Sequence, residues 1–114
     1  MSTAGDPSSE NADRYFLIVL KMVPGRTLSP EVLGLHAAHL SELDRSGRLV
    51  LAGPVPEHSG GLIALRVASL ADAKAVADED PLVRGGYQSY ELGTWLMSNR
   101  HNGYRPDLQQ DRQK

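Results

Sequence analysis

The stretch LGLHAAHLSELDRSGRLVLAGP, residues 33–54, predicts a helix that runs directly into a strand. Just before it, Ser29 has the oxygen to cap a helix, and Pro30 suits the first helical position, where a missing N–H does no harm. We expect this helix to cover residues 30–45. Gly47 then takes the left-handed conformation that commonly ends a helix. Residues 48–53 follow as a strand.

The rest of the chain supplies three more strands and one more helix. Strands are expected over residues 15–22, 62–67 and 86–96, because these runs are rich in apolar, β-branched and aromatic residues. Ser69, with Asp72 as a capping-box partner, opens a second helix, which ends near Asp80 because Pro81 follows. The order βαββαβ predicts an α+β, ferredoxin-like fold, with a four-stranded antiparallel sheet and both helices on one face.

Two of the strands are apolar on both faces. Residues 16–20 and 49–52 do not alternate between apolar and polar side chains. A sheet with helices on one face only should show that alternation. We therefore expect the bare face to pack against a second copy, so that two sheets lie face to face in a homodimer of the dimeric α/β barrel type.

Length and composition favour one domain of a cytoplasmic protein. The 114 residues divide into a polar, disordered segment 1–13, a domain 14–97 and a polar tail 98–114. There is no cysteine, the longest apolar run is too short to span a bilayer, and the start of the chain does not have the pattern of a signal peptide. The net charge is −2 with both signs scattered. We expect no binding to nucleic acid or membranes.

Two long segments resemble the YCII-related proteins. They are HLSELDRSGRLVLAGPV, residues 39–55, and GGLIALRVASLADAKAVADEDPLVRGGYQSYELGTW, residues 60–95. The resemblance implies a dimeric α/β-barrel fold and a site built on a helix histidine and the aspartate of a DP pair, here His39 and Asp80. Most members of that family have no established reaction, but one removes chloride from a chlorinated hydroxyhydroquinone.

His39 also attracts attention without the resemblance. It falls on the apolar face of the first predicted helix, where an imidazole needs a hydrogen-bond partner. That face is formed by Val32, Leu33, Leu35, Leu40 and Leu43. Asp80, at the exit of the second helix, is the candidate, since a carboxylate fixes the tautomer of the ring. The pair is either structural, tying the two helices together, or catalytic, with His39 as general acid or base. Asp80 can also cap the turn formed by PLV.

The other candidates are weaker. His36 lies at the centre of the same helical arc, either as a packing histidine or as a contact to substrate. Gly53, Pro54 and Ser59 belong to a glycine-rich connection that either lines a binding site or is an ordinary loop. The two histidines lack a carboxylate or cysteine at ligand spacing in their helix, so no metal and no cofactor are expected.

Two functions remain open at this point. The first is a small cofactor-independent enzyme, a lyase or isomerase, that uses His39 and Asp80 on a small aromatic or enolic substrate. The second is a non-catalytic dimeric protein that binds a small molecule or serves as an accessory protein of a metabolic pathway. Replacement of His39 discriminates between them, because only the first predicts lost turnover.

Overall fold

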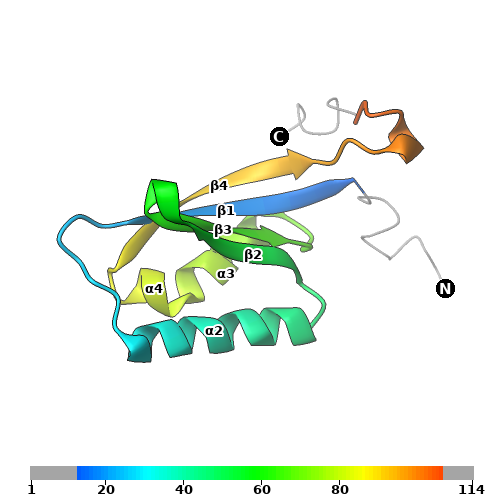
Figure 1. The fold of residues 1–114 in the computed structure, drawn as a ribbon. Coiled ribbons are helices and arrows are strands. Elements are labelled where there is room, and N and C mark those ends of the chain that lie inside the picture. Colours follow the sequence, from blue (N-terminus) through cyan, green and yellow to red (C-terminus); the bar gives the residue numbers. More distant parts are fainter. Residues whose placement is uncertain (1–12, 107–114) are drawn as a thin grey trace.

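The computed structural model describes residues 13–106 and contains one four-stranded antiparallel sheet with helices on one face (Figure 1). The strands lie in the order β2-β3-β1-β4, which confirms the predicted ferredoxin-like topology. The elements are β1 (Arg14–Met22), α2 (Pro30–Arg45), β2 (Leu49–Val55), η2 (Pro56–His58), β3 (Gly60–Leu65), α3 (Leu70–Glu79), α4 (Pro81–Arg84), β4 (Gln88–Leu96) and η3 (Arg100–Asn102).

The helix boundaries follow the expected capping chemistry. The Ser29 hydroxyl accepts a hydrogen bond from the Val32 N–H at 3.2 Å, and Pro30 is the first residue of α2. Gly47, after the helix, has φ +81°. Ser69 caps α3 by accepting from the Asp72 N–H at 3.1 Å. The one-turn helix α4 lies where only a turn was expected.

The core lies between the sheet and the helices. In β1, Phe16, Ile18 and Leu20 all point toward the helices, and all are buried. Register places Leu65 opposite Phe16, and Ile63 opposite Ile18, so the same face of β3 continues the core. The helices complete this core with Leu43, Ala73, Val76 and Ala77.

None of the α-helices of the described residues covers the opposite face of the sheet (Figure 1), and this face carries apolar side chains. Leu51, Leu62 and Trp95 project from it, with exposed fractions of 60%, 39% and 42%. Leu17 and Val19 of β1 share this face because they alternate with the core residues. This explains the unbroken apolar run in β1. The homodimer stays a prediction.

Strands β2 and β3 reach farther into the connecting segment than expected. Beyond the expected end of β2 at Gly53, Pro54 and Val55 are paired strand residues, opposite Gly61 and Gly60. The reason is close backbone contact, which needs glycine: a Cβ on Gly60 would lie 1.9 Å from the carbonyl oxygen of Leu20. Pro is tolerated because β2 is an edge strand.

The predicted terminal segments lie partly outside the described residues, as 1–12 and 107–114 are not described. The Asp13 carboxylate accepts hydrogen bonds from the side-chain amides of Asn99 and Asn102, at 3.0 and 2.8 Å. The part of the tail that is described is therefore fastened beside the start of β1. The proposed domain boundaries stay predictions. No helix within residues 13–106 has the length and apolar character needed to cross a membrane.

Candidate functional site

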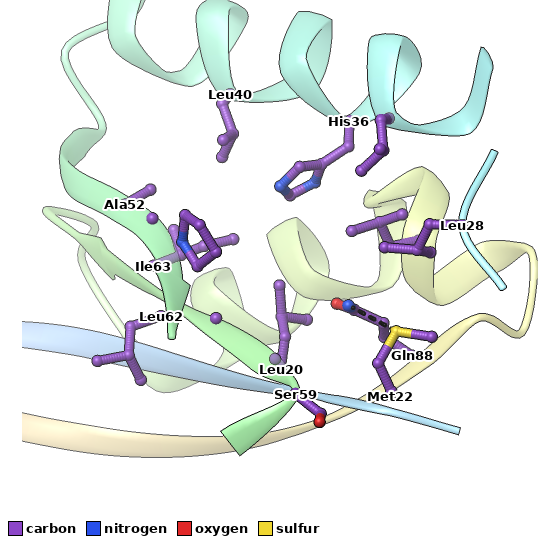
Figure 2. Close-up of a pocket in the computed structure, with 16 residues that line it drawn as sticks. Leu20, Met22, Leu28, His36, Leu40, Ala52, Ser59, Leu62, Ile63 and Gln88 are labelled. Atoms are coloured by element: carbon purple, nitrogen blue, oxygen red, sulfur yellow. Dashed lines mark hydrogen bonds between the residues drawn. The ribbon is translucent and has the colours of Figure 1, made fainter. Parts of the chain in front are cut away.

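A cavity of about 480 Å³ lies between α2 and the end of the sheet where β2 meets β3 (Figure 2). This volume falls in the range of small-molecule binding sites. Its walls are mostly aliphatic. The lining residues are Leu20, Met22, Leu28, Leu33, His36, Leu40, Ala52, Gly53, Pro54, Ser59, Gly60, Gly61, Leu62, Ile63, Leu82 and Gln88.

The cavity is open because this corner of the sheet carries small residues. Ala52 and Pro54 of β2 and Gly61 of β3 share the face that looks toward α2. None of these residues has a side chain long enough to reach the helix. The segment read from the sequence as a glycine-rich connection therefore forms one wall of the hollow.

His36 is the titratable residue in the lining. Its ring descends from α2 into the cavity (Figure 2), and its side chain is 18% exposed. Nδ1 of this ring lies 2.9 Å from Oδ1 of Asp80, whose side chain is only 1% exposed. Helix α2 thus meets the junction of α3 and α4 through a contact between the partly buried His36 ring and the buried Asp80 carboxylate.

Asp80 is held by a second hydrogen bond. Its Oδ1 also accepts from the Leu82 N–H at 2.9 Å, which caps α4. The capping role expected for Asp80 is therefore confirmed, and it coexists with the histidine contact. Because an ionised carboxylate only accepts, Nδ1 of His36 carries the proton. The lone pair of the neutral ring is then on Nε2, which has no hydrogen-bond partner within residues 13–106.

The predicted contact between His39 and Asp80 is wrong, because His36 takes that place. No hydrogen bond or ion pair between described residues joins His39 to Asp80, and Nε2 of His39 is buried without a partner. His39 does not line the cavity either. A catalytic role for His39 oriented by Asp80 therefore has no geometric basis in the described part of the chain.

The reason is the rotation of α2 about its axis. Val32 and Leu43 are buried, whereas Leu33 and Leu35, counted in the predicted apolar face, are 44% and 59% exposed. The inward stripe therefore runs through Val32, His36, Leu40 and Leu43. The signal was present in the sequence, where His36 lies at the centre of the predicted arc.

Three other predicted positions do line the cavity: Gly53, Pro54 and Ser59. Ser59 has φ +54° and lies at the end of the cavity away from His36 (Figure 2). Sequence reasoning missed Gln88, the first residue of β4, which is 7% exposed. The signal is its place on the inward face of β4, in alternation with Tyr90 and Leu92.

The lining contains no Asp, Glu, Lys or Arg from the described residues. This favours an uncharged ligand, since an unpaired charge is costly in an apolar cavity. Within residues 13–106 there is also no group of three or more His, Cys, Asp or Glu that is placed to hold a metal ion.

These features define a ferredoxin-like α+β domain with a cavity of the size that small molecules occupy and a histidine–aspartate pair at its edge. The chain belongs to the YCII-related family, because the model of the YCII-related domain matches residues 15–96. No curated protein sequence matches the chain significantly.

Several solved structures are similar to this chain, among them the following two. The first is 5-chloro-2-hydroxyhydroquinone dehydrochlorinase (TftG) from Burkholderia phenoliruptrix AC1100, solved in complex with 2,5-dihydroxybenzoquinone. It is 22% identical, with a TM-score of 0.57, and the match covers 76% of this chain and 97% of that one. The second is the structural-genomics protein YjcS, at 13% identity and a TM-score of 0.50, covering 74% and 97%. At these identities the likeness shows the fold.

Proposed function

We propose that this chain is a small enzyme in which His36, oriented by Asp80, performs acid–base chemistry on an uncharged molecule bound in the cavity. The observation that carries the proposal is the 2.9 Å contact between Nδ1 of His36 and the buried Asp80 carboxylate, with the ring lining the cavity. His36 replaces His39 in the mechanism expected from the sequence. Of the two histidines, only His36 both contacts Asp80 and lines the cavity.

The geometry supports a general base at Nε2 of His36. Asp80 holds the proton on Nδ1 and stabilises the positive charge that forms when Nε2 accepts a second proton. The Leu82 N–H fixes the carboxylate in turn. Such a positioned histidine contributes about 10²- to 10⁴-fold to a rate, which suits proton removal from an activated O–H or C–H group.

The reaction class is isomerisation or elimination on a small phenolic or enolic substrate. Removal of a proton from one ring hydroxyl, with addition of a proton to the chlorine-bearing carbon, gives a keto tautomer in which that carbon is tetrahedral. Loss of chloride from this carbon, together with the proton of a second hydroxyl, then completes the elimination and leaves a quinone. Loss of HCl changes no overall oxidation state, so it needs no external oxidant. Support comes from the uncharged, mostly aliphatic lining and from the similar structure TftG, which is a dehydrochlorinase.

The functional unit of this proposal is a cytoplasmic homodimer that associates through the sheet faces. Support comes from the apolar face opposite the helices, where Leu51, Leu62 and Trp95 are substantially exposed. Large exposed apolar side chains on one face are typical of an interaction site.

The test is chloride release from 5-chloro-2-hydroxyhydroquinone under anaerobic conditions, measured for the natural chain and for His36→Gln, Asp80→Asn and His39→Gln. We expect turnover by the natural chain, a loss of about 10²- to 10⁴-fold in His36→Gln, a smaller loss in Asp80→Asn, and little change in His39→Gln. The last variant is the matched control, since it changes a histidine on the same helix that does not line the cavity.

Two outcomes count against the proposal. If His39→Gln inactivates the protein and His36→Gln does not, the proposal has assigned the chemistry to the wrong histidine. Tight binding of 2,5-dihydroxybenzoquinone by the natural chain without turnover of phenolic or enolic substrates would favour a non-catalytic binding or accessory protein.

A further inference from the structure

Gln88 is a second polar group in the cavity, and the proposed chemistry does not use it. Its side chain extends from the start of β4 toward the space below the His36 ring (Figure 2). The residue is 7% exposed, so the amide is almost completely removed from water. The cavity therefore has two polar side chains on different walls, the Gln88 amide on the sheet and the His36 ring on α2.

The hydrogen bonds of this amide are poorly satisfied. Among residues 13–106, Nε2 of Gln88 donates a hydrogen bond only to the sulfur of Met22, at 3.2 Å, and a thioether is a weak acceptor. Oε1 is buried and has no partner in the described part of the chain. Exchanging the amide nitrogen and oxygen leaves the same problem, because the sulfur then offers no donor to the oxygen.

A buried amide in this state is costly for the protein alone. An unsatisfied buried acceptor destabilises the folded state by about 1–3 kcal/mol. The neighbours of Gln88 in the cavity, such as Leu20, Leu82 and Met22, offer no side-chain N–H or O–H donor. A hydroxyl group on a bound ligand is a donor of the kind that would satisfy Oε1.

We infer that Gln88 is a specificity-determining residue that recognises a second hydroxyl group of the substrate, on the side of the ring away from His36. The substrate is then an uncharged ring with two polar groups, one facing each wall of the cavity. This inference rests on the proposed function, because it places the substrate in the same cavity. It concerns the binding of the substrate, so testing it requires no turnover.

The experiment compares two probes that differ in one group: hydroquinone, with two hydroxyls, and 4-methylphenol, with a methyl in place of the second. Dissociation constants are measured by calorimetry under argon for the natural chain and for Gln88→Met, a variant of similar size without the amide. Leu33→Met is the matched control, since it changes another lining residue without touching a polar group.

We expect Gln88→Met to shift the ratio of the two dissociation constants by about 3- to 10-fold toward 4-methylphenol, the effect of one hydrogen bond. Leu33→Met keeps the natural ratio. Gln88→Met also has a melting temperature equal to or above that of the natural chain, because it removes an unsatisfied amide.

An unchanged ratio in Gln88→Met, an equal shift in Leu33→Met, or no binding of hydroquinone at millimolar concentration would each overturn the inference. So would a lowered melting temperature with an unchanged ratio, since that describes a structural glutamine. The proposed function fails separately, through the activities of the His36 and His39 variants.

Discussion

Nδ1 of His36 and Oδ1 of Asp80 lie 2.9 Å apart although 44 residues separate them in the chain. The same carboxylate oxygen accepts the Leu82 N–H at 2.9 Å. One buried atom therefore links the middle of α2 to the start of α4. The pair has a structural as well as a proposed chemical role, and substitutions at Asp80 can separate the two.

We expect Asp80→Ala to destabilise the protein by about 2–4 kcal/mol, because it leaves the Leu82 N–H without its cap and the His36 ring without its partner. Asp80→Asn should cost about 1 kcal/mol, since its carbonyl oxygen still accepts both hydrogen bonds. Urea unfolding at pH 7 measures both. Equal losses in the two variants would contradict the capping role of Asp80.

Replacing each of the two histidines of α2 should have a different effect on the free energy of unfolding. His39→Leu removes a buried nitrogen without a partner, so its free energy of unfolding should be unchanged or about 1 kcal/mol higher. His36→Leu leaves the Asp80 carboxylate buried with one hydrogen bond fewer, and should lose about 2–4 kcal/mol. Urea unfolding of both variants provides the check, and the reverse order would show that the pairing is misassigned.

The proposed homodimer predicts a different effect for two leucines of similar exposure. Leu51 on the sheet face is 60% exposed and Leu35 on α2 is 59% exposed. Leu51→Asp should yield monomers in sedimentation equilibrium at micromolar concentration, because it buries a charge in an apolar interface. Leu35→Asp should stay dimeric. Dissociation by Leu35→Asp alone would place the interface on α2.

Gly60 and Gly34 should respond oppositely to alanine. A Cβ on Gly60 meets the Leu20 carbonyl oxygen at 1.9 Å, so β3 must move away from β1. We expect Gly60→Ala to cost about 3 kcal/mol or more. A Cβ added to Gly34 in α2 would meet no described atom within 4 Å outside the nearby backbone of its own helix. Gly34→Ala should therefore raise the free energy of unfolding by about 0.5–1 kcal/mol through helix propensity. Thermal unfolding of both variants measures these changes in stability. A Gly60→Ala variant as stable as the natural chain would contradict the pairing of β3 with β1.

The surface cluster of Lys74, Asp78 and Tyr90 predicts that the stability of the fold decreases at both acid and alkaline pH. Hydrogen bonds from Lys74 and then Tyr90 lower the pKa of Asp78 from 3.8, and the bond to Asp78 raises the pKa of Tyr90 from 10.0. The Asp78 contribution to stability is present above its ordinary pKa and is lost as the pH falls through the lower folded value. The Tyr90 contribution is present below pH 10 and is lost as the pH rises through the higher folded value.

The measurement is ultraviolet titration of tyrosinate in the folded protein. Asp78→Asn should bring the pKa of Tyr90 back toward 10.0, because it removes the charged acceptor of the Tyr90 hydroxyl. Asp72→Asn on the same helix should leave the Tyr90 titration unchanged. A Tyr90 titration that does not respond to Asp78→Asn would show that the hydrogen bond is absent in solution.

The element order could be read from the sequence because its signals are local. Ser29 and Pro30 begin α2 where expected, Gly47 follows its end with a positive φ, and Ser69 caps α3. Capping and left-handed turns depend on residues within one turn of each other, so no distant contact is needed to predict them. The βαββαβ order, and from it the sheet, follow directly.

The choice between His36 and His39 depends on distant contacts. Both lie in the apolar arc of α2, and the rotation of the helix against the sheet turns His36 toward Asp80 and leaves Nε2 of His39 without a partner. That rotation is set by packing of Val32 and Leu43 on residues far away in the chain. Helical periodicity locates an arc and does not resolve which of two neighbouring rings within it meets a given carboxylate.

By itself the sequence determined the order of strands and helices, their capping residues, and the glycine-rich segment that becomes a wall of the cavity. Only the tertiary structure decided that His36 pairs with Asp80, that Gln88 enters the same cavity, and that β2 extends past Gly53 to Val55 while β3 begins at Gly60. The physical reason is that side-chain contacts across 44 or more residues depend on how whole elements pack. Local propensities set the elements but not their relative rotation.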